Sequence, residues 1–176
     1  MPVFARTKLL MEELCLTLRP RIDITYSGPN PQKAYEKLLD VLLNVLKVPR
    51  ENIQEKVFKW ERAPEGETFS SGMEVIKNFD KFSYMQLTIS IGGFAKPSKE
   101  FGKEGRVSIE IEGVVRTEYP QDTTWERSFL YEIFRTFYHK VFYKEERRRY
   151  VEKCREWMFL IESELKSFFA MLPKMV

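Results

Sequence analysis

The sequence is poor in the residues that most often do chemistry, with one histidine, two cysteines and eight glycines. His139 is the histidine, and Glu132, the nearest earlier carboxylate on the same side of a helix, would lie about 10 Å away. A zinc site or a catalytic triad needs several such groups in contact. The glycines form no phosphate-binding loop, and no serine sits in a nucleophile elbow. We therefore expect no metal, no cofactor and no catalytic residue.

Long apolar runs are also missing. The N-terminal stretch 9–18 is interrupted by Glu12 and Glu13, and no run approaches the roughly 18 apolar residues that a membrane span needs. Cys15 and Cys154 fit no metal-binding or disulfide framework, so we expect two reduced thiols, with Cys154 buried. These absences predict a soluble protein of the reducing cytoplasm.

Residues 123–172 contain neither glycine nor proline, which predicts a very long helix. Thr123 and Glu126 are spaced as a capping box at its start, and Pro173 follows its end. A straight helix of this length would span roughly 75 Å, whereas a compact chain of this size measures roughly 40 Å across. The length therefore implies either that the helix breaks near 143–149 or that its second half projects and finds a partner.

The apolar residues of this stretch lie on two stripes, rotated from one another by roughly 100° on a straight helix. The first stripe consists of Leu130, Phe134, Phe137 and Val141. The second, a heptad-like seam, consists of Val151, Cys154, Met158, Ile161, Leu165, Phe168 and Leu172. We predict two helical segments that meet near 143–149.

The chain is rich in apolar residues, at 43%, and in aromatic residues, at 14%. Its net charge is a mild +3. This is enough for a real core in one domain. Period-two alternation predicts strands over 20–27, 53–61, 69–77, 82–94 and 106–118. Residues 4–14 are compatible with a short helix. A helix of about 17 residues follows Asn30 as its N-cap, and 95–105 reads as a mobile hairpin tip.

The predicted class is therefore α+β: a curved antiparallel sheet of about five strands in the order β-α-β-β-β-β-α-α, with the helices on its apolar face. We expect residues 1–176 to form a single domain, with 150–172 a possible helical oligomerisation extension. This order, over residues 20–142, resembles a shortened helix-grip arrangement such as that of the START proteins. The resemblance rests on element order and implies a space between sheet and terminal helix.

A basic stripe on the long helix suggests one possible function. Five cations fall within about a third of the helical circumference, beside several aromatic residues, and such a surface can hold phosphates and stack bases. They are Lys140, Lys144, Arg147, Arg148 and Arg155. The alternative interpretation is a solvated helix whose arginines pair with neighbouring glutamates. We keep nucleic-acid or polyanion binding as a possibility that is not favoured.

The favoured hypothesis is a non-enzymatic binding or assembly module that forms a homodimer through the seam of its C-terminal helix, 150–172. A second alternative is a small apolar ligand held between the sheet and the terminal helix. The candidate lining residues are Phe58, Trp60, Phe134, Phe137 and Trp157.

Overall fold

The computed structural model describes residues 10–17, 20–100, 102–118, 129–141 and 143–171. Its sheet is built from β1 (Leu10–Leu14), β2 (Arg21–Pro29), β3 (Ile53–Ala63), β4 (Gly66–Asn78), β5 (Ser83–Ser98) and β6 (Gly102–Glu118). Its helices are α1 (Lys33–Asp40), α2 (Phe129–Val141) and α3 (Tyr143–Met171), with a π turn over Val41–Val45 and a 3-10 turn over Arg50–Asn52.

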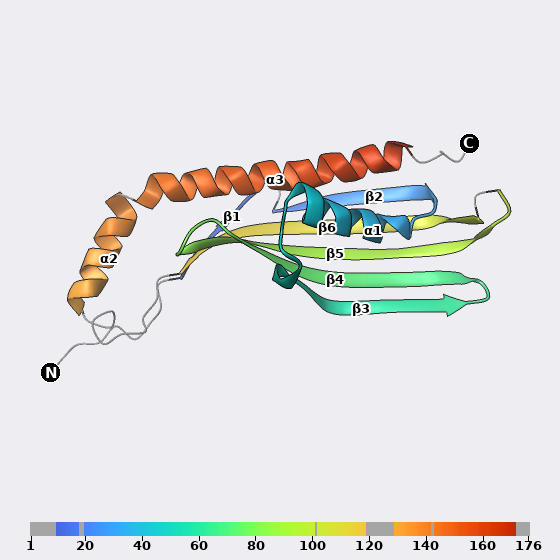
Figure 1. Cartoon of the computed structure of the whole chain (residues 1–176), viewed down its shortest axis with the longest axis horizontal. Coiled ribbons are helices and arrows are strands. Elements are labelled where there is room, and N and C mark those ends of the chain that lie inside the picture. Colours follow the sequence, from blue (N-terminus) through green and yellow to red (C-terminus); the bar gives the residue numbers. More distant parts are fainter. Residues whose placement is uncertain (1–9, 18–19, 101, 119–128, 142, 172–176) are drawn as a thin grey trace.

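The sheet is antiparallel throughout and its second half is a meander. Neighbouring strands run in the order β1-β6-β5-β4-β3, and β2 also pairs with β6. The two N-terminal strands share one edge of β6, because Leu10–Leu14 pairs with its end and Arg21–Pro29 with its start. The α+β class and the curved antiparallel sheet are confirmed (Figure 1). The sheet has six strands because residues 10–14 form a strand, not the short helix that was considered.

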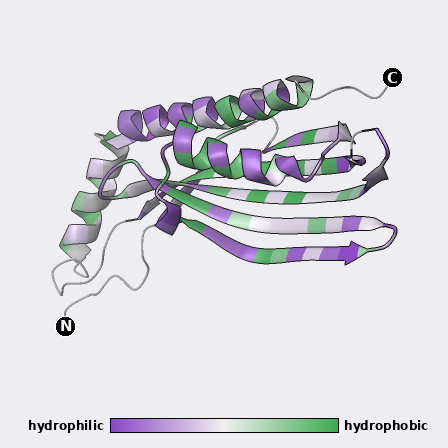
Figure 2. Ribbon diagram, turned by 45° about the vertical axis from the view of Figure 1, so that its right-hand side comes forward, coloured by the Kyte–Doolittle hydropathy of each residue, from purple (hydrophilic) through white to green (hydrophobic). Residues whose placement is uncertain are grey.

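One face of the sheet carries the core, as the alternation of residues predicted. Met85, Leu87 and Ile89 on β5 are fully buried, as are Ile109 and Ile111 on β6. The hydrophobic and hydrophilic residues alternate visibly along the strands (Figure 2). Helices α1 and α3 pack against one another, and α3 contacts β2, β5 and β6. Their burial of apolar surface drives the association of helices and sheet.

Two local predictions are corrected. Asn30 is not a side-chain N-cap: it adopts φ 52°, its carbonyl accepts the Lys33 backbone N–H at 3.1 Å, and α1 begins at Lys33. Asparagine tolerates this left-handed conformation well. The hairpin tip predicted over 95–105 is shorter than expected, because strands β5 and β6 stay paired as far as Ser98 and Gly102. The hydrogen bonds between the ends of β5 and β6 outweigh the preference of the local glycines and lysines for a loop.

The C-terminal stretch is two helices, as predicted, with α2 turning away from the line of α3 (Figure 1). α3 begins at Tyr143, at the near edge of the predicted junction. The Tyr143 hydroxyl donates to Asp80 at 2.5 Å and lies 2.8 Å from the Ser83 hydroxyl, which fixes the first turn of α3 to the β4–β5 turn. The break therefore comes from tertiary packing. The Thr123–Glu126 capping box lies outside the described residues.

The seam of α3 forms part of the monomer's own core. Cys154, Met158, Ile161 and Leu165 all have no exposed surface. Gly113 on β6 makes this approach possible, because a Cβ there would lie 2.5 Å from the Met158 sulfur. These four residues of the seam that was predicted to form a homodimer interface are therefore covered within the monomer.

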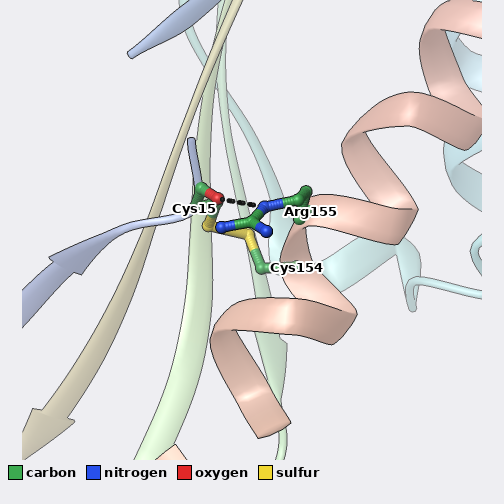
Figure 3. Close-up of a disulfide and its surroundings, with 3 residues drawn as sticks. All are labelled: Cys15, Cys154 and Arg155. Atoms are coloured by element: carbon green, nitrogen blue, oxygen red, sulfur yellow. Dashed lines mark hydrogen bonds between the residues drawn. A yellow bond between two sulfur atoms is a disulfide. The ribbon is translucent and has the colours of Figure 1, made fainter. Parts of the chain in front are cut away.

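The prediction of two reduced thiols is wrong. Cys15 and Cys154 form a disulfide, with their Cα atoms 5.6 Å apart (Figure 3). It ties the segment after β1 to the middle of α3, and the Arg155 Nε–H donates to the Cys15 carbonyl at 3.3 Å. Sequence spacing could not reveal this pair, because the two cysteines are 139 positions apart and meet only when the chain between them is folded. The expectation of a reducing compartment rested on two reduced thiols, and the disulfide removes that basis.

Candidate functional site

The structure divides the predicted basic stripe between two surroundings. Arg147 faces β1, with its Nη2 2.8 Å from a Glu13 carboxylate oxygen. Arg155 faces the segment after β1, through its bond to Cys15. Lys144 and Arg148 face solvent. The side chain of Lys140 is outside the described residues. The stripe is therefore not one continuous exposed surface.

Ion pairs within the helix also offset part of its charge. Arg148 lies 3.3 Å from Glu152, and Arg149 lies 2.7 Å from Glu146. Together with the Arg147–Glu13 pair, these contacts correspond to the alternative interpretation of the stripe, a solvated helix with neighbouring glutamates. Such exposed pairs add little stability, but each one lowers the attraction of this region for a polyanion.

The five residues predicted to line an apolar cavity lie on three elements. Phe58 and Trp60 are neighbours on β3, with ring centroids 6.1 Å apart. Trp157 on α3 stacks on Phe79 with centroids 5.4 Å apart. Phe134 and Phe137 are exposed on α2. None of the five lines either of the two pockets described below.

Six large, exposed apolar side chains on α2 form what we term the α2 apolar surface. Its six members are between 48% and 68% exposed: Leu130, Ile133, Phe134, Phe137, Tyr138 and Val141. They include the whole of the first stripe that the sequence revealed. At roughly 150–250 Å² for an aromatic side chain, the six expose on the order of 600 Å² of apolar surface. That is at or above the upper end of what monomeric soluble proteins usually present.

A second feature is a cleft of about 590 Å³ between the edge strand β2 and α3, here called the β2–α3 cleft. Its walls combine apolar and charged side chains: Leu16, Thr17, Arg21, Ile22, Asp23, Arg155, Phe159 and Glu162. The volume is within the usual range for small-molecule sites. Of these residues, sequence analysis singled out Arg155 alone. The others carry no sequence signal, because the turn after β1 and the flank of α3 meet only in the folded chain.

A smaller pocket of about 280 Å³ lies between α1 and β3. Its Tyr35 hydroxyl donates to Glu55, and burial together with this bond raises the pKa of Tyr35 to about 12. The volume falls slightly below the usual range for ligand sites. We therefore assign this pocket a structural role.

The densest polar cluster surrounds Asp80. Its carboxylate accepts the backbone N–H groups of Phe82 and Ser83, both at 2.7 Å, and the hydroxyls of Tyr143 and Tyr150 at 2.5 and 2.9 Å. Burial opposes ionisation, but these four donors outweigh it and lower the pKa of Asp80. Burial and the bond to Asp80 raise the pKa of Tyr150 to about 12. A carboxylate with both oxygens occupied in this way anchors α3 rather than acting as a base.

Within the described parts of the chain, no three histidine, cysteine, aspartate or glutamate side chains gather as metal ligands. No described helix is long and apolar enough to cross a membrane. The sequence matches no protein-family model, and no curated protein shows a significant match to it.

Proposed function

We propose that the protein is a non-enzymatic assembly module that forms a homodimer through the α2 apolar surface. The observation that carries this proposal is the exposure of six large apolar side chains on one short helix. Leaving such a surface in water has a substantial free-energy cost, at about 25 cal/mol per Å². Large exposed apolar patches commonly mark sites of association.

The size of the surface suits a pair of identical chains. A stable interface buries roughly 800 Å² on each partner, and the six side chains contribute on the order of 600 Å² of this from α2 alone. A two-fold pair buries the same patch on both copies. Antiparallel packing of two α2 helices would also place the positive end of each helix dipole beside the negative end of the other.

Two observations favour a second copy over an anionic partner such as a nucleic acid or a lipid surface. The basic residues that follow α2 are partly neutralised by Glu13, Glu146 and Glu152. The α2 apolar surface itself offers aliphatic and aromatic groups, which match another apolar helix. The buried residues Cys154, Met158 and Leu165 hold α3 against the sheet, and α2 contacts α3.

The test is the solution mass of the full chain by light scattering at micromolar concentration. We expect twice the chain mass of 21.0 kDa. Phe134→Glu places a charge at the centre of the α2 apolar surface and should yield a folded monomer. Thr136→Glu adds the same charge at an exposed polar position of the same helix, and should leave the dimer intact.

Two outcomes would overturn the proposal: a wild-type monomer, and a Phe134→Glu variant that remains dimeric. A wild-type monomer that binds lipid vesicles, whereas the Phe134→Glu variant does not, would assign the α2 apolar surface to a membrane instead.

A further inference from the structure

We propose that the β2–α3 cleft binds a small amphipathic carboxylic acid, such as a medium-chain fatty acid. The guanidinium of Arg155 would hold the carboxylate, and Leu16, Ile22 and Phe159 would contact the apolar chain. This site is separate from the α2 apolar surface and shares no residue with it.

The apolar wall of the cleft combines two nearly buried side chains with one that is half exposed. Leu16 and Ile22 are almost fully buried and provide apolar surface from the segment after β1 and from β2. Phe159 stands on the flank of α3, one turn after Arg155, with half of its surface exposed. It lies beside the buried seam but is not part of it, so its ring is available for contact. Ligand sites typically combine such apolar walls with a few polar groups.

Most charges in the cleft already have partners. Arg21 lies 3.3 Å from Asp23 and 3.6 Å from Glu110 on β6. Glu162 lies 2.6 Å from Lys166, one turn further along α3. Among the described residues that line the cleft, these contacts account for one of the two cations and both carboxylates.

Arg155 is the exception. Its Nε–H donates to the Cys15 carbonyl at 3.3 Å, which orients the side chain beside the disulfide (Figure 3). Among the described residues no carboxylate pairs with it, and its two terminal nitrogens have no hydrogen-bond partner there. A half-buried guanidinium without an ion-pair partner among the described residues can bind an anion from solution, and its planar fork matches a carboxylate in two parallel hydrogen bonds.

The surroundings select a carboxylate over a phosphate. One guanidinium supplies one positive charge, whereas a phosphate group carries close to two negative charges at neutral pH. Asp23 and Glu162 line the same walls, and they would repel a doubly charged group more strongly than a singly charged one. A singly charged head with an apolar tail therefore fits the cleft better than a nucleotide or an inorganic phosphate.

The experiment titrates the full chain with decanoate and follows backbone amide shifts by NMR, with decanol as a neutral probe of the same length. We expect decanoate to shift the amides of Thr17, Ile22 and Phe159, and decanol to bind more weakly. Arg155→Met keeps the apolar stem of the side chain and removes its charge. It should weaken decanoate binding by roughly tenfold to a hundredfold, as expected for a charge-assisted hydrogen bond.

Arg148→Met is the matched control, because it makes the same change on an outward side of α3 where the side chain is 82% exposed. It should leave the affinity for decanoate unchanged. Phe159→Ser, at an exposed position, tests the apolar wall independently if Arg155→Met lowers the melting temperature. It should also weaken binding.

The proposal is overturned if decanoate does not bind, if decanol binds equally well, or if binding survives both substitutions in the cleft. Inorganic phosphate that competes with decanoate at similar concentrations would contradict the choice of a carboxylate. The Phe134→Glu variant separates the two proposals. It should bind decanoate as the wild type does, and a loss of binding there would place the acid on α2 instead.

Discussion

The Cys15–Cys154 disulfide should be a major contributor to the stability of this fold. It joins residues separated by 139 positions, so it restricts the unfolded chain far more than a local crosslink would. The chain-entropy description gives about 5 kcal/mol for a loop of this length, and measured losses for native disulfides are typically about 2–5 kcal/mol. For a chain of this size, that corresponds to a fall in melting temperature on the order of 10 °C.

The assay is thermal unfolding followed by circular dichroism, with and without dithiothreitol. The wild type should lose stability on reduction, whereas the Cys15→Ala/Cys154→Ala double variant should be less stable and insensitive to the reductant. Alkylation of the unreduced, unfolded protein should modify neither cysteine. Two modified cysteines, or a melting temperature that reduction leaves unchanged, would refute the reasoning.

The remaining predictions concern α3 and its anchor. Leu165→Ala should lower the free energy of unfolding in urea by about 3–5 kcal/mol, because the Leu165 side chain is fully buried. Leu160→Ala, at a 37% exposed position, should lower it by about 1 kcal/mol or less. Equal losses would contradict the burial of the seam. A chain that ends after Arg149 should not fold, since it lacks this core helix, and a cooperative melting transition would show otherwise. Asp80 has a folded-state pKa below its unfolded value, so its stabilisation is present above about pH 4 and is lost as pH falls through the folded pKa. Asp80→Asn should therefore lower the free energy of unfolding at neutral pH and make it depend less on pH below about pH 4. An unchanged dependence on pH would exclude the stabilising role of the Asp80 carboxylate.

The parts of the fold that depend on local periodicity could be predicted from the sequence. Alternation on β5 and β6 identified both the strands and their buried face, because a strand with one dry side repeats every two residues. The division of the C-terminal stretch into two helices followed from stripes that do not align. Its location near Tyr143 depends on Asp80 and Ser83, which lie far away in the sequence.

The parts that depend on distant partners could not be predicted. The heptad-like spacing of Cys154, Met158, Ile161 and Leu165 indicates an apolar surface but not whether a sheet or another chain covers it. The spacing favours a dimer interface, whereas in the structure these four residues are buried within the monomer and the Leu130–Val141 stripe is exposed. The disulfide and the β2–α3 cleft likewise arise from segments that meet only after folding.

The central claim, association through α2, is tested most directly by hydrogen exchange measured at low and high protein concentration. Amides of 129–141 should become more protected as the concentration rises, because dimerisation covers the α2 apolar surface. Amides of α1 should not change, and Phe134→Glu should abolish the dependence. Protection of 129–141 that is independent of concentration, or a dependence that appears elsewhere in the chain, would contradict the account.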